Sequence, residues 1–112
     1  MVTEPLVDSA DQIERRHALR KKFIGKIEIE WGSATLVGTV RDIGPQGLFI
    51  DLNPELWLGA TFLARLAVHP ILLLDCKVKR VEPGRGIGVT FQVPEENGKA
   101  QLEALLAALP SL

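Results

Sequence analysis

Residues 26–31 read KIEIEW, so the apolar side chains of Ile27, Ile29 and Trp31 alternate with charged ones. A period of two is typical of a strand that buries one face, because successive side chains of a strand point to opposite sides of the sheet. A Gly-Ser pair follows at residues 32–33 and predicts a turn. This stretch therefore predicts the first strand of a sheet and a reversal of the chain.

Further strands are predicted on both sides of this turn. The remaining segments rich in apolar and β-branched residues are 34–40, 48–52, 61–68, 71–81 and 86–91. Six short strands at this close spacing indicate an antiparallel barrel or sandwich, and a barrel has no vulnerable edges. The predicted fold class is mainly β. Between two of the strands, residues 54–59 are expected to make one short turn that places Leu56 or Trp57 on the core.

The C-terminal segment has a different period. Leu102, Leu105, Leu106 and Leu109 follow the spacing i, i+3, i+4 and i+7. This spacing predicts an amphipathic α-helix over residues 95–109, with its leucines packed against an open end of the barrel. Gly98 disfavours a helix interior, so a helix that begins at this glycine is the alternative.

The length of 112 residues predicts one domain. We expect a flexible leader at residues 1–13 and a single domain at residues 14–112. No unbroken apolar run approaches the roughly 20 residues of a membrane helix, so we expect no membrane insertion and a cytoplasmic location. The lone Cys76 and two histidines offer no spacing that suits a metal ion, so neither a metal nor a cofactor is expected.

Positive charge is concentrated in one place. Five of the thirteen Lys and Arg residues lie in the basic cluster, residues 15–22, which leaves eight against fourteen acidic residues elsewhere. DNA or RNA binding is therefore not expected, because affinity for nucleic acid requires many basic residues spread along a face. A small barrel that binds single strands would also need aromatic side chains on a basic face. A compact anion suits the basic cluster better.

The basic cluster and a later turn have complementary chemistry. Arg16 and Arg20 are four residues apart, a spacing that places both on one side of a helix or strand. Guanidinium groups bind phosphate oxygens and the O6 and N7 atoms of guanine. Asp42 precedes Gly44 and Gly47, and a carboxylate accepts hydrogen bonds from N1–H and N2–H of guanine. The glycines allow the backbone to approach a ligand, and Gly47 is expected to need a positive φ.

Each feature also has a purely structural interpretation. A basic cluster is usually a solvated face, and a D-x-G-x-x-G turn between strands is usually only a turn. The pairing of the two features favours ligand binding.

The two motifs resemble the PilZ domain family. The family pattern is R-x-x-x-R, here Arg16 to Arg20, followed after about twenty residues by D/N-x-S-x-x-G, here Asp42 to Gly47. The resemblance extends over residues 12–109 and includes the strand at residues 86–91 and the leucine-rich helix. It implies a six-stranded antiparallel PilZ-type β-barrel with a C-terminal α-helix. The chain departs from the pattern at Gly44, where the family has serine.

The resemblance implies a cyclic di-GMP receptor that is not an enzyme. Arg16 and Arg20 would bind phosphate and guanine, Asp42 would bind a guanine edge, Gly44 and Gly47 would form the turn, and Arg15 would be an accessory contact. The receptor would act on an effector protein in motility, polysaccharide synthesis or another second-messenger output. The alternative is a PilZ-like adaptor that works through protein contacts without the dinucleotide. A homodimer and the number of bound ligands stay open.

Overall fold

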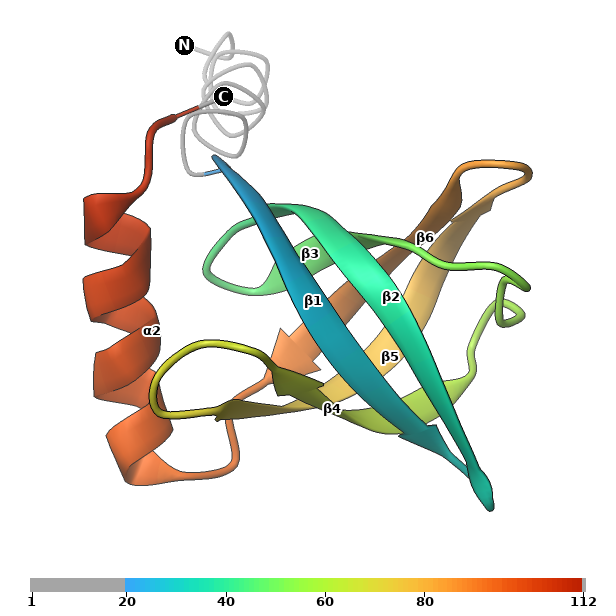
Figure 1. Ribbon diagram of the computed structural model, residues 1–112, viewed down its shortest axis with the longest axis horizontal. Coiled ribbons are helices and arrows are strands. Elements are labelled where there is room, and N and C mark those ends of the chain that lie inside the picture. The colour runs from blue at the N-terminus through green and yellow to red at the C-terminus, as the bar shows by residue number, and fades with distance from the viewer. Residues whose placement is uncertain (1–19, 112) are drawn as a thin grey trace, which may run out of the picture.

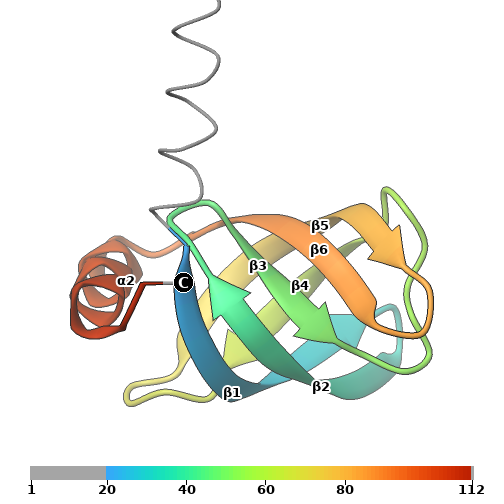
Figure 2. The ribbon, with the colours of Figure 1, turned by 90° about the horizontal axis from the view of Figure 1, so that it is seen from above.

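The computed structural model describes residues 20–111, which form a barrel of six antiparallel strands and one helix (Figure 1). The elements are β1 (Lys21–Trp31), β2 (Ala34–Ile43), β3 (Gly47–Asp51), β4 (Thr61–Leu66), β5 (Leu72–Glu82), β6 (Gly86–Gln92) and α2 (Glu96–Ala108). The sheet closes in the order β1-β2-β3-β6-β5-β4, with β4 paired to β1. Figure 2 shows α2 beside the closed barrel. The predicted mainly β fold, a six-stranded barrel with a C-terminal helix, is confirmed.

The predicted leader at residues 1–13 lies outside the described residues. The division into this leader and one domain over residues 14–112 therefore stays a prediction.

The barrel is filled by aliphatic side chains that alternate along the strands. Its largest fully buried side chains are Ile27, Ile29, Val40, Ile43, Leu48, Ile50, Leu66, Leu72, Leu74, Val78 and Ile87. Burying each such side chain contributes roughly 1.5–3 kcal/mol, which makes this core the main source of stability. No polar or charged side chain is buried within residues 20–111. The charged groups of this part of the chain therefore lie on the outer surface of the barrel.

The hairpin between β1 and β2 contains the predicted Gly-Ser turn. Trp31 pairs with Ala34, and Gly32 adopts a φ of 62°, which a glycine accommodates without strain. Trp31 itself, the last residue of β1, is only half-buried, and it packs edge-on against Trp57 with 4.5 Å between ring centroids. Of the two residues considered for the core in the β3–β4 connection, Leu56 is buried and Trp57 is 61% exposed.

The strands beside the predicted glycine turn extend further than the sequence pattern suggested. Asp42 belongs to β2 and Gly47 to β3, so only residues 44–46 connect the two strands. β2 extends to these residues because its backbone is paired on both sides. Asp42 lies opposite Lys22 of β1 and opposite Phe49 of β3. Asp42 is therefore held by the sheet rather than by a loop.

Helix α2 covers almost the whole predicted range and begins before Gly98. Gly98 lies in its first turns, where close packing leaves no room for a side chain. A Cβ at this position would lie 2.7 Å from Val93 Cγ1 and 3.2 Å from Leu72 Cδ1. Leu102 is buried, and the other three leucines of the stripe pack against the core as predicted. No helix within residues 20–111 is long and apolar enough to cross a bilayer.

Candidate functional site

The structure brings Arg20 and Asp42 together. Arg20 immediately precedes β1, whose residue Lys22 pairs with Asp42 of β2. Across this pair of strands the Arg20 Nη2 donates to Asp42 Oδ1 in an ion pair. The two side chains are 29% and 24% exposed, so both stay accessible to a ligand from solvent. The two charged groups that the sequence separates by 22 positions thus form one polar centre.

The turn next to this pair is fixed by backbone hydrogen bonds. The N–H of Gly44 donates to the carbonyl oxygen of Gly47 at 2.8 Å. The carbonyl oxygen of Gln46 accepts from the N–H of Phe91 at 2.9 Å, which ties the turn to β6. Gly44 stands where the PilZ pattern has serine, so this turn has no hydroxyl at that position.

Gly47 is required by close approach rather than by its backbone conformation. A Cβ at this position would lie 2.7 Å from the carbonyl oxygen of Val89 and 3.4 Å from Nη1 of Arg20. The predicted positive φ at Gly47 is wrong, because among the described residues positive φ occurs only at Gly32, Gly59, Gly84 and Gly86. The lack of a side chain lets β3 and β6 approach each other beneath Arg20.

A cavity of about 520 Å³ lies beside these residues. Its walls are Arg20, residues 44–48, Arg80 and residues 88–90. A second cavity of about 460 Å³ contains Asp42, Phe49 and Arg80 together with other charged residues of the same face. Because Arg80 lines both cavities, they adjoin each other on the outer surface of β2, β3, β6 and β5.

Sequence reasoning missed Arg80. It lies on β5 opposite Gly88 of β6, and Gly88 lies opposite Phe49 of β3. Arg80 belongs to neither motif, and its one signal in the sequence is that two consecutive charged residues, Lys79 and Arg80, interrupt the alternation of β5. Only the register of the barrel brings it to the cavity of Arg20.

Arg15 and Arg16, which the sequence analysis assigned to the same site, lie outside the described residues. Their contribution stays a prediction. Within residues 20–111 no three His, Cys, Asp or Glu side chains are grouped so as to hold a metal ion.

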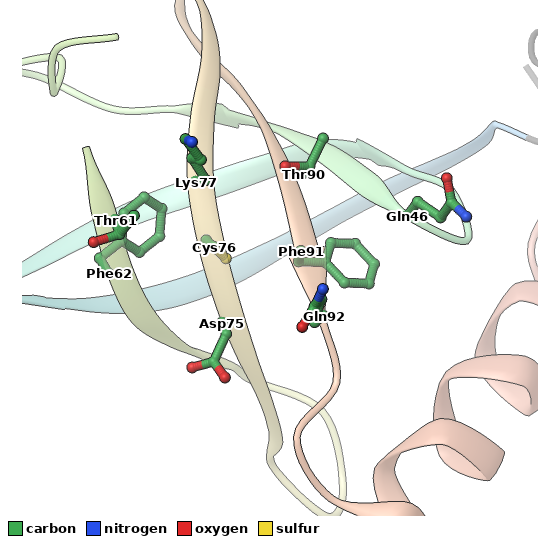
Figure 3. A pocket seen from close by; sticks show the side chains of 9 residues that line it. All are labelled: Gln46, Thr61, Phe62, Asp75, Cys76, Lys77, Thr90, Phe91 and Gln92. Atoms are coloured by element: carbon green, nitrogen blue, oxygen red, sulfur yellow. The ribbon is translucent and has the colours of Figure 1, made fainter. Parts of the chain in front are cut away.

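A larger cavity of about 660 Å³ lies over β4, β5 and β6 (Figure 3). It contains Asp75, Cys76 and Lys77 of β5 but no arginine. Since an anionic nucleotide requires cationic and bidentate donors, we assign the site to the smaller cavity that contains Arg20 and Arg80. The size of the larger cavity does not outweigh its lack of a bidentate cation, because it contains Lys77 but no guanidinium group.

Cys76 in that larger cavity is an inert thiol. Burial, with a smaller contribution from the Asp75 carboxylate, raises the pKa of Cys76 from 9.0 to about 12. The nucleophilic form of cysteine is the thiolate, which is scarce here at neutral pH. Its sequence phase with Leu74 and Val78 predicted a buried structural position, and Cys76 is 4% exposed.

We therefore expect Cys76 to react slowly with Ellman's reagent at pH 8 in the folded protein and rapidly in urea. The folded state holds the thiol proton more tightly than the unfolded chain. The contribution of this thiol to stability is thus complete below pH 9 and is lost as the pH rises toward 12. Rapid labelling of the folded protein at pH 8 would contradict the buried position.

Comparison with known proteins agrees with this architecture. Residues 14–108 match the PilZ domain family. The crystal structure of the PilZ domain of CeSA from a cellulose-synthesizing bacterium superposes with a TM-score of 0.62. It is 16% identical in sequence, and the match covers 79% of this chain and 94% of that one. At this identity the likeness shows the fold alone.

No curated protein sequence is significantly similar to this chain. The family match, however, spans most of it, from the basic cluster to the end of α2. PilZ domains are binding domains of a cyclic di-GMP receptor family rather than enzymes. The barrel order, the C-terminal helix and the family match together show that this chain belongs to the PilZ domain family.

Proposed function

We propose that this protein is a cyclic di-GMP receptor whose site is formed by Arg20, Asp42, Gly44 and Gly47, with Arg15 and Arg16 as further contacts. The observation that carries the proposal is the ion pair of Arg20 with Asp42, which is partly exposed beside a cavity edged by the glycine turn. Both partners of this pair belong to the two motifs of the family. The site therefore combines a cation for phosphate with a carboxylate for a base.

The chemistry of these groups favours guanine over adenine. A carboxylate accepts two hydrogen bonds from N1–H and N2–H of guanine, and adenine offers no such pair of donors on that edge. Asp42 retains its second carboxylate oxygen when Arg20 contacts the first. A guanidinium forms bidentate bonds with phosphate. Arg20 and Asp42 are thus suited to hold a phosphate and a guanine that belong to one ligand.

Ligand binding would act on an effector protein through the surface near the start of β1. This step is supported by the contacts of the residues that follow Arg20. The N–H of Lys22 donates to the carbonyl oxygen of Pro110 at 3.1 Å, and Lys21 Nζ contacts Ser111 Oγ at 3.3 Å. A ligand that moves Arg20 would therefore also displace the segment after α2 and change the surface offered to a partner. The effector would belong to a motility, polysaccharide or other second-messenger system.

Titration calorimetry with cyclic di-GMP, with cyclic di-AMP as the control ligand, tests the proposal. We expect saturable heat with cyclic di-GMP and at least a tenfold weaker response to cyclic di-AMP, since one base-specific pair of hydrogen bonds is worth about 1–3 kcal/mol. Absence of binding at high micromolar cyclic di-GMP would leave the alternative, an adaptor that acts only through protein contacts.

Replacing Gly44 with serine is expected to strengthen cyclic di-GMP binding by up to about tenfold. The change supplies the hydroxyl of the family pattern, and one hydrogen bond contributes about 0.5–1.5 kcal/mol. Gly44 does not adopt a positive φ, so its backbone conformation accepts serine. The measurement is the dissociation constant of both proteins by calorimetry. An affinity that falls on this substitution would show that the turn does not contact the ligand in the family manner.

A further inference from the structure

One row of residues crosses the outer face of the barrel beside the proposed site. The register aligns Asp42 of β2 with Phe49 of β3, Phe49 with Gly88 of β6, and Gly88 with Arg80 of β5. Directly paired residues of neighbouring strands point to the same face, and the strands lie about 4.8 Å apart. Asp42 and Arg80 are therefore the two ends of a continuous strip with an aromatic ring and a glycine between them.

Phe49 is covered by two arginines instead of by the core. It is only 6% exposed, yet it does not belong to the core cluster. The Cζ atoms of Arg80 and Arg85 lie 5.9 Å and 5.7 Å from its ring centroid. Both distances are within the range of cation–π contact. The ring thus supports two guanidinium groups on its solvent side.

Glu82 and Gly88 fix the position of Arg80. The carboxylate of Glu82 accepts from Arg80 Nε at 2.8 Å and from Arg85 Nη1 at 2.9 Å. At Gly88 a Cβ would lie 3.3 Å from Arg80 Cζ, so the absence of a side chain there gives the guanidinium its place over β6. Glu82 is accordingly a positioning residue for both arginines.

The outer surface of this cluster stays accessible. The side chain of Arg80 is 60% exposed and that of Arg85 is 74% exposed. A guanidinium plane that rests on an aromatic ring with one face can stack a nucleobase on the other. Arg80 lines two cavities, the one that contains Arg20 and the one that contains Asp42 and Phe49. A ligand held by Arg20 and Asp42 can therefore reach it.

We propose that Phe49, Arg80 and Arg85 form a second base-stacking subsite, which receives the other purine of a dinucleotide whose first guanine and phosphate are held by Arg20 and Asp42. The inference rests on the proposed function and adds a basis for selecting dinucleotides over mononucleotides. A mononucleotide such as GMP has one base and fills only the first subsite. Arg80 is the specificity-determining residue of this arrangement.

The test measures the affinity of the full chain for two ligands. Binding of cyclic di-GMP is measured by calorimetry, and binding of GMP by chemical-shift titration. Stacking on one base predicts that Arg80→Ala weakens cyclic di-GMP binding about 5- to 100-fold and changes GMP binding less than about twofold. Arg80→Lys keeps the charge but not the plane, and is expected to behave like Arg80→Ala. Glu82→Gln is expected to give a smaller loss for cyclic di-GMP alone. Arg65→Ala is the matched control, because Arg65 forms an ion pair with Glu30 on β1 and β4, outside both cavities.

The outcomes separate the two proposals. If the wild-type protein binds cyclic di-GMP and Arg80→Ala binds it equally well, the second subsite is wrong while the receptor function stands. Full affinity in Arg80→Lys, or an equal loss for both ligands in Arg80→Ala, would also overturn the stacking role, because either result reduces Arg80 to a source of positive charge. No binding by the wild-type protein would overturn both proposals.

Discussion

Replacing Arg20 with alanine is expected to weaken cyclic di-GMP binding by at least about 100-fold while leaving the fold intact. Each charge-assisted hydrogen bond of a guanidinium to a phosphate is worth about 1.5–3 kcal/mol, and Arg20 can form two. Removing it also takes away the guanidinium that contacts the Asp42 carboxylate. The ion pair of Arg20 with Asp42 is partly exposed and contributes only about 0–1 kcal/mol to stability.

Calorimetry on Arg20→Ala and on the control Arg65→Ala checks this expectation. Arg65 is a fair control because it is also a part-exposed arginine in an ion pair with a strand carboxylate. Thermal unfolding of both variants should stay within a few degrees of the wild-type protein. Equal affinities for Arg20→Ala and Arg65→Ala would remove Arg20 from the site.

Replacing Gly47 with alanine is expected to reduce both stability and ligand binding. The new methyl group would lie 2.7 Å from the backbone oxygen of Val89, which cannot move without shifting the β3–β6 ladder. Such overpacking costs about 1–3 kcal/mol, and each kcal/mol lowers the Tm of a domain of this size by about 4–8 °C. The methyl group also approaches Arg20 Nη1, so the arginine is expected to lose its position beside the cavity.

Gly88→Ala is the matched control for this substitution. The closest contact of its methyl group would be the end of the Arg80 side chain, at 3.3 Å, and that flexible end can move. Scanning calorimetry should therefore show a clear fall in Tm for Gly47→Ala and little change for Gly88→Ala. A Gly47→Ala protein as stable as the wild type would mean that the two strands are less closely paired than described.

Most of the fold could be predicted because its strands alternate cleanly. Ile27 and Ile29 are fully buried as their period of two requires, and the leucines of α2 face the core. Prediction was weaker at the ends of elements. Trp31 follows the same alternation but is only half-buried at the end of β1. Its contact with Trp57 was not predictable, because Trp57 comes from a connection whose path the sequence pattern does not specify.

The candidate site was predictable only where a motif marks it. Arg20 and Asp42 were identified from spacing, and the structure brings them together. Arg80 was not, because its place depends on two β-bulges. One shifts the β2–β3 register between Val40 and Asp42, and the other shifts the β5–β6 register between Val78 and Arg80. Two consecutive charged residues interrupt the alternation at each bulge, Arg41 and Asp42 in β2 and Lys79 and Arg80 in β5. A bulge changes which residues lie opposite each other, and the interruption alone does not give the new register.

The most direct test of the proposed site is a titration of ¹⁵N-labelled protein with cyclic di-GMP, followed through the amide resonances of its glycines. Gly44 and Gly47 lie at the cavity beside Arg20, whereas Gly32 and Gly59 lie in connections that line neither of the two adjoining cavities. We predict that the resonances of Gly44 and Gly47 shift and saturate, while those of Gly32 and Gly59 stay in place. Saturating shifts confined to Gly32 and Gly59, or no shifts at all, would contradict a cyclic di-GMP site at Arg20 and Asp42.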